Sequence, residues 1–204
     1  HRLFRRQRQM CIRDSSVTDR VPDWLSNSEK GWVTAEYNML PGSSGNRISR
    51  KSFESGRSKE ISRLIGRSLR AVCNLGIING YSFTVDCDVL EADGGTRTAS
   101  INGAWIALND TFTKMVNENK LVQNPFTCKV GAISVGIVDG ELVADLDYAK
   151  DSNAEVDLNL VLDEKFEILE IQGTAEGKPF SKDSLDSLFN IAKECVEEIF
   201  KIQN

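Results

Sequence analysis

Apolar and polar residues alternate along two runs in the first half of the chain, which is the pattern of strands with one buried face. The first run covers residues 32–40 and ends at a turn rich in Pro, Gly and Ser, and the second covers residues 81–90 and ends before a glycine pair. Between them, the polar and basic residues 46–56 predict a flexible loop. The apolar positions of the two runs are Val33, Ala35, Tyr37, Met39, Tyr81, Phe83, Val85, Cys87 and Val89.

Three other segments carry apolar residues three and four positions apart, which predicts amphipathic helices. The first covers residues 57–76, with Arg57 at its N-terminal edge and Gly76 as the residue that ends it. The second covers residues 101–116. The third begins after Ser181, whose hydroxyl is suited to cap the N-terminus of a helix.

Four further strands are predicted in the second half of the chain. Residues 131–138 and 141–148 flank an Asp-Gly pair, which is a strong signal for a tight hairpin turn. Residues 156–162 and 166–172 form two more apolar runs. The order strand, helix, strand, helix, four strands, helix lacks the regular alternation of parallel-sheet proteins. It indicates an α+β fold, an α/β sandwich in which sheets pack against helices.

The residue types present restrict the chemistry that the chain can perform. The only histidine is His1, so no internal histidine can complete a Ser-His-Asp or Cys-His pair. No CxxC pair is present, so zinc-finger spacing is excluded and buried, reduced thiols are expected. The cysteines are Cys11, Cys73, Cys87, Cys128 and Cys195. Catalysis would therefore depend on carboxylates, arginines, backbone amides or a hard metal ion.

Charge is distributed unevenly along the chain. Residues 1–70 carry 15 Lys/Arg against 7 Asp/Glu, a net +8, and residues 71–204 carry 10 against 23, a net −13. A basic face with an acidic face suits phosphate chemistry on nucleic acid, although charge alone favours two solvated faces. No apolar run approaches the ~20 residues of a membrane span, and no apolar secretory signal begins the chain. A cytoplasmic protein without membrane contact is expected.

The first fifteen residues, HRLFRRQRQMCIRDS, differ in composition from the rest of the chain. They are rich in arginine, have no apolar period and lead into the next segment without a turn signal. We interpret residues 1–15 as a non-native leader and leave them out of the fold prediction. Residues 16–204 are then expected to form a single domain.

The segment from Asp93 to Thr98 joins a predicted strand to a predicted helix and has the features of an anion site. Gly94 and Gly95 allow the backbone to approach a ligand, Thr96 offers a hydroxyl, and Arg97 offers a planar guanidinium suited to phosphate oxygens. Unpaired amides at the helix N-terminus face outward at the same place. A tight turn with a solvated arginine is the alternative, and for a generic Gly-Gly-Thr-Arg sequence it is slightly favoured.

Four aspartates, Asp145, Asp147, Asp151 and Asp157, form a second candidate site. Their carboxylates repel one another unless a cation or the geometry of the fold relieves the repulsion. Asp151 and Asp157 are suited to bind one magnesium ion through oxygen ligands, which would offset charge on a transferring phosphate. An acidic, solvent-facing loop is the alternative, and spacing alone does not exclude it.

Six stretches keep the order and spacing of one known family: WVTAEYNMLP, SRLIGRSLRA, DCDVLEADGGTRTASI, SVGIVDGE, DLDYAKDSNAEVDLN and IQGTAEG. They resemble ribonuclease PH over about residues 16–204, and six stretches in register are highly specific. The resemblance implies the family's α/β sandwich, a ribosomal-protein-like βαβα fold with mixed sheets packed against helices. Polynucleotide phosphorylase and the exosome ring share this fold, so the fold alone does not determine the activity.

The resemblance implies roles for the residues at matching positions. The positions that match the family's site for the attacking inorganic phosphate are Arg57, Gly95, Thr96 and Arg97. Asp151 and Asp157 match the paired aspartates that hold the catalytic metal, Mg²⁺ or Mn²⁺, and handle protons. Arg47 and Arg50 fall in the loop with which the family grips transfer RNA.

The activity that the resemblance implies is phosphate-dependent 3′-to-5′ exoribonuclease action. Such an enzyme trims the 3′ end of transfer-RNA precursors and other RNAs, releases nucleoside diphosphates in a reversible nucleotidyl transfer, and assembles as a homohexamer, a trimer of dimers. A non-catalytic, RNA-binding ring subunit of an exosome-like complex is the alternative, and a hydrolytic nuclease is a third possibility. The chain keeps the acidic pair and the phosphate arginines together, which favours the enzyme.

Three differences from the family are expected to matter. The family has a further N-terminal portion of roughly forty residues, an ordinary size for a few strands, which residues 1–15 do not resemble. A truncated chain with an uncovered apolar sheet is therefore expected. The basic loop is a few residues shorter than usual, and Gly42 stands where many relatives have an arginine. Both changes weaken the expected grip on transfer RNA.

Overall fold

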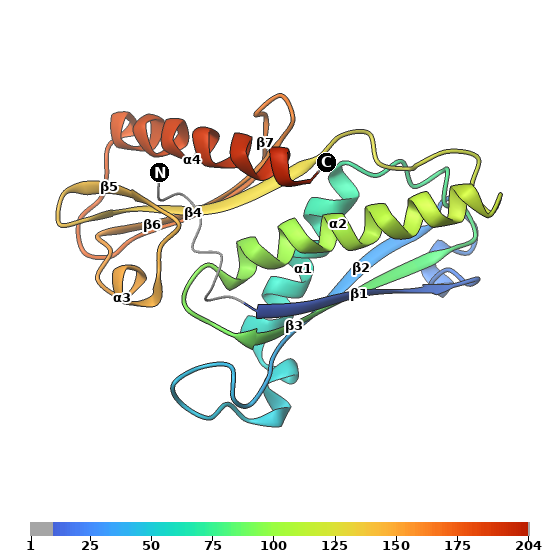
Figure 1. Cartoon of the computed structure of the whole chain (residues 1–204), viewed down its shortest axis with the longest axis horizontal. Coiled ribbons are helices and arrows are strands. Elements are labelled where there is room, and N and C mark those ends of the chain that lie inside the picture. The colour runs from blue at the N-terminus through green and yellow to red at the C-terminus, as the bar shows by residue number, and fades with distance from the viewer. Residues whose placement is uncertain (1–9, 204) are drawn as a thin grey trace.

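The computed structural model describes residues 10–203 of the chain. In this part, two sheets alternate with helices, so that the layers are sheet, helices, sheet and helix (Figure 1). The first sheet contains β1 (Met10–Thr18), β2 (Trp32–Met39) and β3 (Ser82–Glu91), in the order β1-β3-β2. The central strand β3 runs antiparallel to β1 and parallel to β2.

The second sheet contains antiparallel strands in the order β5-β4-β6-β7. They are β4 (Val130–Val138), β5 (Glu141–Ala144), β6 (Val156–Asp163) and β7 (Ile168–Ala175). β4 and β5 form the predicted hairpin. Its turn residues Asp139 and Gly140 have φ angles of 52° and 76°, the left-handed conformation that a two-residue type I′ turn requires at both positions.

The two longer helices of the middle layer separate the sheets. α1 (Gly56–Ala71) packs against β2, and α2 (Thr96–Asn117) packs against β1 and β4. α4 (Lys182–Ile202) covers the other face of the second sheet (Figure 1). The shorter elements are the single turn α3 (Tyr148–Asp151) and the 3-10 helices η1 (Asp23–Leu25) and η2 (Arg50–Glu54). Within the described residues, no helix has the length and apolar character needed to cross a membrane.

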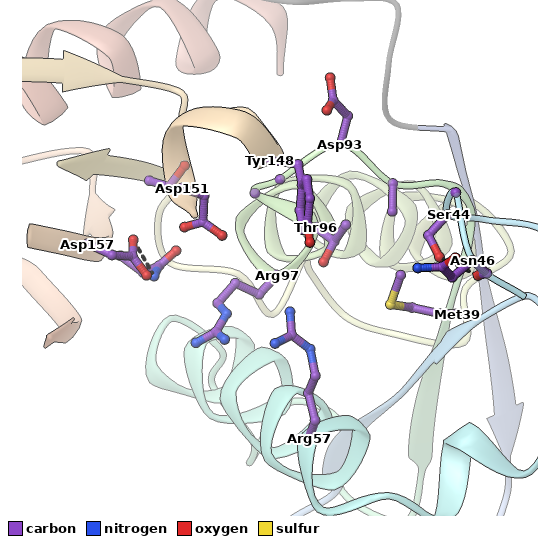
Figure 2. Close-up of a pocket in the computed structure, with 16 residues that line it drawn as sticks. Met39, Ser44, Asn46, Arg57, Asp93, Thr96, Arg97, Tyr148, Asp151 and Asp157 are labelled. Atoms are coloured by element: carbon purple, nitrogen blue, oxygen red, sulfur yellow. Dashed lines mark hydrogen bonds between the residues drawn. The ribbon is translucent and has the colours of Figure 1, made fainter. Parts of the chain in front are cut away.

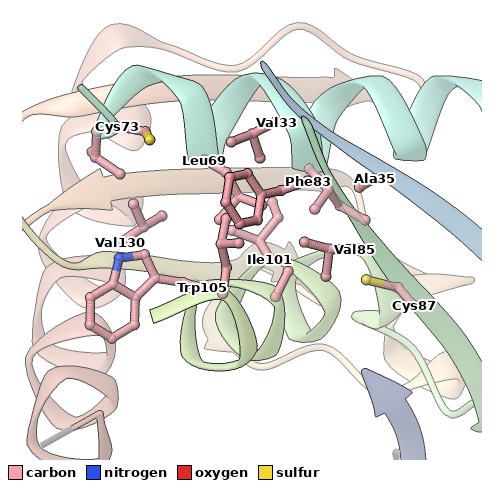
Figure 3. Close-up of a cluster of buried hydrophobic side chains, with 14 of the residues drawn as sticks. Val33, Ala35, Leu69, Cys73, Phe83, Val85, Cys87, Ile101, Trp105 and Val130 are labelled. Carbon is pink, nitrogen blue, oxygen red and sulfur yellow. The ribbon is translucent and has the colours of Figure 1, made fainter. Parts of the chain in front are cut away.

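The main hydrophobic core lies between the first sheet and the layer of α1 and α2, and it extends to the near face of the second sheet (Figure 3). Phe83 of β3 packs edge-to-face on Phe112 of α2, with ring centroids 4.9 Å apart. Truncating the fully buried Phe83 to alanine would cost about 3–5 kcal/mol. The core residues labelled in Figure 3 are Val33, Ala35, Leu69, Cys73, Phe83, Val85, Cys87, Ile101, Trp105 and Val130.

The second sheet is covered on both faces, and this decides which of its side chains point toward α1 and α2. Ala132 of β4 belongs to the main core, whereas the next residue, Ile133, belongs to the core under α4. Because side chains along a strand alternate between faces, Ser134 points to the side of α1 and α2. The same alternation in β6 places Asp157 and Asn159 on that side. They flank Leu158, whose side chain belongs to the core under α4.

Side-chain hydrogen bonds hold the two middle-layer helices against strand edges. The Tyr37 amide on the outer edge of β2 donates to Ser62 Oγ of α1 at 2.9 Å. On α2, Asn102 accepts from the Ala132 amide at 2.7 Å and donates to the Ala132 carbonyl at 2.8 Å. These bonds satisfy backbone groups that lack a strand partner, and they fix where the N-termini of both helices lie.

The predicted α+β sandwich is confirmed by this architecture. The helix that begins near Arg57 is confirmed too, but its predicted end is wrong, because Val72 and not Gly76 is the C-terminal cap. Tertiary pairing ends the helix, since Cys73 forms an isolated β-bridge with Phe126. Sequence spacing within the helix carries no information about that bridge.

Two other local predictions are corrected. The strand predicted over residues 141–148 ends at Ala144, because Asp145 adopts a φ of 55° and turns the chain out of the sheet. The residues that follow form α3, which the apolar pattern did not indicate. The loop predicted over residues 46–56 includes η2, so part of it is regular.

The strand β1 begins in the stretch that was left out of the fold prediction, residues 1–15, and continues to Thr18. Residues 10–18 pair with β3 along its whole length and form an edge strand of the first sheet. Residues 1–9 lie outside the described residues. That residues 1–15 are a non-native leader, and that residues 16–204 form a single domain, remain predictions.

Candidate active site

A cavity of ≈ 630 Å³ opens where the N-termini of α1 and α2 face the second sheet (Figure 2). It brings together residues that are far apart in the sequence. All of the residues predicted to bind phosphate or metal line it: Arg57, Gly95, Thr96, Arg97, Asp151 and Asp157. The other lining residues are Met39, Ser44, Gly45, Asn46, Ala92, Asp93, Gly94, Ser134, Tyr148 and Asn159.

The N-terminus of α2 forms one wall of the cavity. Its N-cap is Gly95, in the left-handed conformation with φ 55°, and no side chain caps the helix. The amides of the first turn are therefore available to an anion, as the sequence predicted. Thr96 is held in place, because its hydroxyl is hydrogen-bonded to the buried Tyr37 hydroxyl at 2.8 Å.

Gly94 joins this wall directly to the segment before α3. A Cβ at Gly94 would lie 2.3 Å from the Leu146 carbonyl oxygen and 3.0 Å from Asp147 Cα, so a larger residue would force the two segments apart. Its φ of 79° also favours glycine. The close approach couples the position of the phosphate-binding turn to that of α3.

Two arginines point into the cavity from different helices (Figure 2). Arg57 lies in the first turn of α1, just after the N-cap Ser55. The side chain of Arg97 is 22% exposed. Its Nη1 donates to Gln172 Oε1 at 3.1 Å and lies 3.8 Å from Glu60 Oε1. Two guanidinium groups in one cavity repel each other unless an anion lies between them, so the pair favours a bound phosphate.

Asp151 and Asp157 form the opposite wall (Figure 2). Asp151 is the last residue of α3, and Asp157 lies near the start of β6. Burial raises the pKa of the Asp157 carboxyl, and the neighbouring Asp151 carboxylate raises this pKa further. The Arg97 guanidinium and a hydrogen bond from Asn159 Nδ2, at 3.5 Å, act in the opposite direction. The two carboxylates are thus electrostatically coupled, as the sequence analysis expected of this pair.

The other two aspartates of the predicted acidic cluster do not line the cavity. Asp147 is the N-cap of α3, and its Oδ1 accepts from the Lys150 amide at 2.7 Å. Asp145 occupies the left-handed turn that ends β5. Their roles in the described structure are to shape the backbone that presents Asp151.

The carboxylate pair can be tested for its fit to a divalent metal ion. Among the described residues, no three His, Cys, Asp or Glu side chains are grouped as a metal site. Mg²⁺ commonly keeps several waters and binds through one or two carboxylates plus substrate phosphates. Asp151 and Asp157 fit that mode. Ser134 Oγ, which is buried without a hydrogen-bond partner in the described structure, belongs to the same wall.

Comparison with known proteins identifies the family. Models of the 3′ exoribonuclease family match residues 14–113 (domain 1) and 128–195 (domain 2). Ribonuclease PH of Dehalococcoides mccartyi strain 195 is 50% identical over an alignment of 205 positions, which covers 99% of this chain and 86% of the relative. The chain belongs to the ribonuclease PH family. The same enzyme from strain BAV1 is also 50% identical, over 98% of this chain and 85% of its own.

Solved structures with lower sequence identity share the ribonuclease PH fold. Rice (Oryza sativa) Rrp46 aligns with a TM-score of 0.71, an Archaeoglobus fulgidus exosome with RNA bound to the active site with 0.78, and an archaeal exosome core with 0.74. Each covers 96% of this chain, at 16% identity, and the chain covers 82%, 80% and 77% of them respectively. The predicted family and fold are therefore confirmed.

Sequence reasoning missed several residues that line the cavity of this ribonuclease PH family member. Asn159 and Ser134 could have been found, because strand alternation places Asn159 on the same face as Asp157 and both strands were predicted. Tyr148 gave no such signal, since α3 was not predicted. Ser44 and Asn46 come from the loop after β2, and their approach to the cavity depends on the path of that loop.

The two loop arginines stand apart from the cavity. Arg47 and Arg50 are exposed and do not line it, although the neighbouring residues 44–46 do. Their position is compatible with contacts to an RNA that extends out of the cavity. Their part in gripping transfer RNA remains a prediction.

Proposed function

We propose that this cavity carries out the phosphorolytic removal of nucleotides from the 3′ end of transfer-RNA precursors. Membership of the ribonuclease PH family confirms the predicted function class, a phosphorolytic 3′ exoribonuclease with inorganic phosphate as co-substrate. The assignment of this activity to the cavity is supported by the different groups on its two walls. One carries two arginines and a helix N-terminus, and the other carries two coupled carboxylates.

The basic wall holds the attacking phosphate in this proposal. Arg57 and Arg97 bind its oxygens, and the amides of Gly95 and Thr96 at the start of α2 orient it. A phosphate oxygen attacks the phosphorus of the terminal phosphodiester, and the bond from that phosphorus to the ribose 3′ oxygen breaks. The basic groups reduce the repulsion between the two anions that must meet.

The acidic wall acts on the leaving group. Asp151 and Asp157 would hold Mg²⁺ or Mn²⁺, which supplies charge neutralisation at the reacting phosphorus when it is bound. The 3′ oxygen that leaves must take a proton. The carboxyls that line the cavity near the reacting bond are on the acidic wall, so we assign the proton donor to that wall.

The products are a nucleoside diphosphate and an RNA shortened by one nucleotide. The bond formed and the bond broken are of similar energy, so the reaction runs in reverse when nucleoside diphosphate is abundant. We propose that the chain acts in the cytoplasm, where its transfer-RNA substrates are, and that it assembles as a homohexamer. A non-catalytic ring subunit is disfavoured, because such a subunit would not need the arginines and the carboxylates in one cavity.

The test is incubation of the protein with a 3′-extended transfer-RNA precursor and Mg²⁺, with and without inorganic phosphate. Shortening that requires phosphate and yields nucleoside diphosphate supports the proposal. Nucleoside monophosphate formed in phosphate-free buffer would instead identify a hydrolytic nuclease. RNA binding without any shortening would identify the ring subunit.

A further inference from the structure

Tyr148 places an exposed aromatic ring at the cavity. Its side chain is 69% exposed, and it is the only aromatic residue among the described residues that line the cavity. Within the described part of the chain, its ring packs on no other aromatic ring and its hydroxyl forms no hydrogen bond. Because the ring lines the cavity and no other ring covers it, its face is available to contact a ligand there.

The backbone that carries Tyr148 is held firmly although the ring is exposed. Tyr148 begins α3 directly after the N-cap Asp147, which is itself buried. The segment before it lies against Gly94 of the phosphate-binding turn, at a distance that excludes any side chain there. Asp151, one turn later in α3, lines the same cavity. The backbone at Tyr148, the phosphate site and Asp151 are thus held close to one another.

We propose that Tyr148 is a stacking platform for the base of the 3′-terminal nucleotide of the RNA. The proposal rests on the proposed function of the cavity and adds how the substrate end is recognised. A tyrosine ring offers every base a flat surface, so it holds RNA ends without selecting a sequence. That suits an exonuclease, which meets a different terminal base after each cycle.

The size of the cavity favours the terminal nucleotide over the nucleotides before it. A volume of ≈ 630 Å³ lies within the roughly 300–1,000 Å³ of pockets that hold one small ligand. The cavity must also admit the attacking phosphate beside Arg57 and Arg97. The base of the nucleotide to be released is therefore the part of the RNA that reaches the ring.

The experiment compares two short single-stranded oligoribonucleotides that differ only at the 3′ end, one intact and one with an abasic terminal ribose. Equilibrium binding is measured without phosphate, and kcat/KM and the KM for phosphate are measured with phosphate and Mg²⁺. The wild-type protein should bind the intact end about 5- to 150-fold more tightly. Tyr148→Ala should remove this preference and leave the KM for phosphate unchanged, whereas Tyr148→Phe, which keeps the ring, should retain the preference.

Trp24→Ala provides a matched control, because Trp24 is 67% exposed and does not line the cavity. It should leave the preference for the intact end unchanged. A Tyr148→Ala protein that still prefers the intact end overturns the proposal. So does one that loses affinity for both ends equally while its melting temperature falls, since that is a structural effect. A wild-type protein that binds the intact end preferentially but forms no nucleoside diphosphate contradicts the proposed function and leaves the stacking role supported.

Discussion

The two walls of the cavity are built in different ways. The basic wall rests on the first turns of two long helices, α1 and α2, which are fixed by hydrogen bonds to strand edges and by the main core. The acidic wall rests on one turn of helix and the start of one strand. The position of α3, which carries Asp151, depends on the cap at Asp147 and on the contact of the preceding segment with Gly94. Asp157 is instead held by β6, which pairs with β4 and β7, so Asp151 is the residue whose position depends most on the phosphate-binding turn.

The electrostatics of the two walls differ as well. On the basic wall, Arg97 is partly balanced by Glu60 and oriented by Gln172. On the acidic wall, the mutual repulsion of Asp151 and Asp157 is not balanced in the same way, and the pKa of Asp157 is raised. A cation bound at the acidic wall would relieve the repulsion between its two carboxylates. Substitutions on each wall should show this contrast.

Asp157→Asn should have the largest effect, because it removes charge from the acidic wall while keeping the volume of the side chain. Metal-dependent turnover should fall about a hundredfold or more, the scale for loss of a group that stabilises the transition state, while RNA affinity changes little. The measurement is kcat for phosphorolysis at saturating RNA. Asp145→Asn is the matched control, since Asp145 lies outside the cavity and its φ of 55° also suits asparagine. Normal turnover of Asp157→Asn would make Asp157 a structural residue only.

Arg97→Ala should come next and should act through the co-substrate. Loss of a hydrogen bond to a charged group corresponds to about 1.5–3 kcal/mol, so the KM for phosphate should rise about 10- to 150-fold. Both short and structured RNAs should be affected alike. Arg67→Ala is the control, because Arg67 is ion-paired with Glu170 at 3.0 Å and does not line the cavity. An unchanged KM for phosphate would place the phosphate elsewhere.

Replacing Arg47 and Arg50 together with alanine tests whether the loop grips RNA at a distance from both walls. Binding of structured transfer-RNA precursors should weaken, and the slope of log affinity against log salt should flatten by about two units at most. Turnover of short single-stranded oligonucleotides should stay close to that of the parent, because such RNAs do not reach the loop. Equal slowing of short and structured RNAs would place the two arginines at the reacting end instead.

Tyr37→Phe should have a smaller effect on the basic wall. It removes the hydroxyl that holds Thr96 and keeps the ring in the core. A net loss of about 0.5–1.5 kcal/mol is expected in the free energy of unfolding, together with a rise of a few fold in the KM for phosphate. Denaturant unfolding and phosphate titration measure the two effects. A loss of stability with no change in the KM would show that the Thr96 hydroxyl does not contribute to phosphate binding.

The raised pKa of Asp157 predicts a small effect on stability with a definite sign. A carboxyl whose pKa is higher in the folded than in the unfolded chain favours the neutral form on folding. That contribution is present below the unfolded pKa and is lost as the pH rises through the folded pKa. With the metal removed by a chelator, the melting temperature of Asp157→Asn should therefore be higher than that of the parent at pH 7. The difference between the two melting temperatures should shrink as the pH falls toward about 4. A difference that does not depend on pH would contradict the ionisation argument.

Most strands and the three long helices could be predicted from the sequence, because their signals are local, and the family resemblance pointed to the residues of the basic wall. Alternation over residues 32–40 and 81–90 is set by one buried face, and the structure confirms it in β2 and β3. Gly95 and Arg97 lie two positions apart at the start of a helix, so their common place at its N-terminus follows from the local sequence.

Features that depend on contacts between distant segments were decided only by the tertiary structure. The end of α1 is set by the pairing of Cys73 with Phe126, and the turn at Asp145 and the cap at Asp147 leave those two aspartates outside the cavity that Asp151 and Asp157 line. Tyr148 became visible only with α3, a single turn that is too short to give a periodic pattern. The physical reason is the same in each case. The spacing of apolar residues indicates which face of one helix or strand is buried, but the positions of the two cavity walls depend on contacts between elements far apart in the chain.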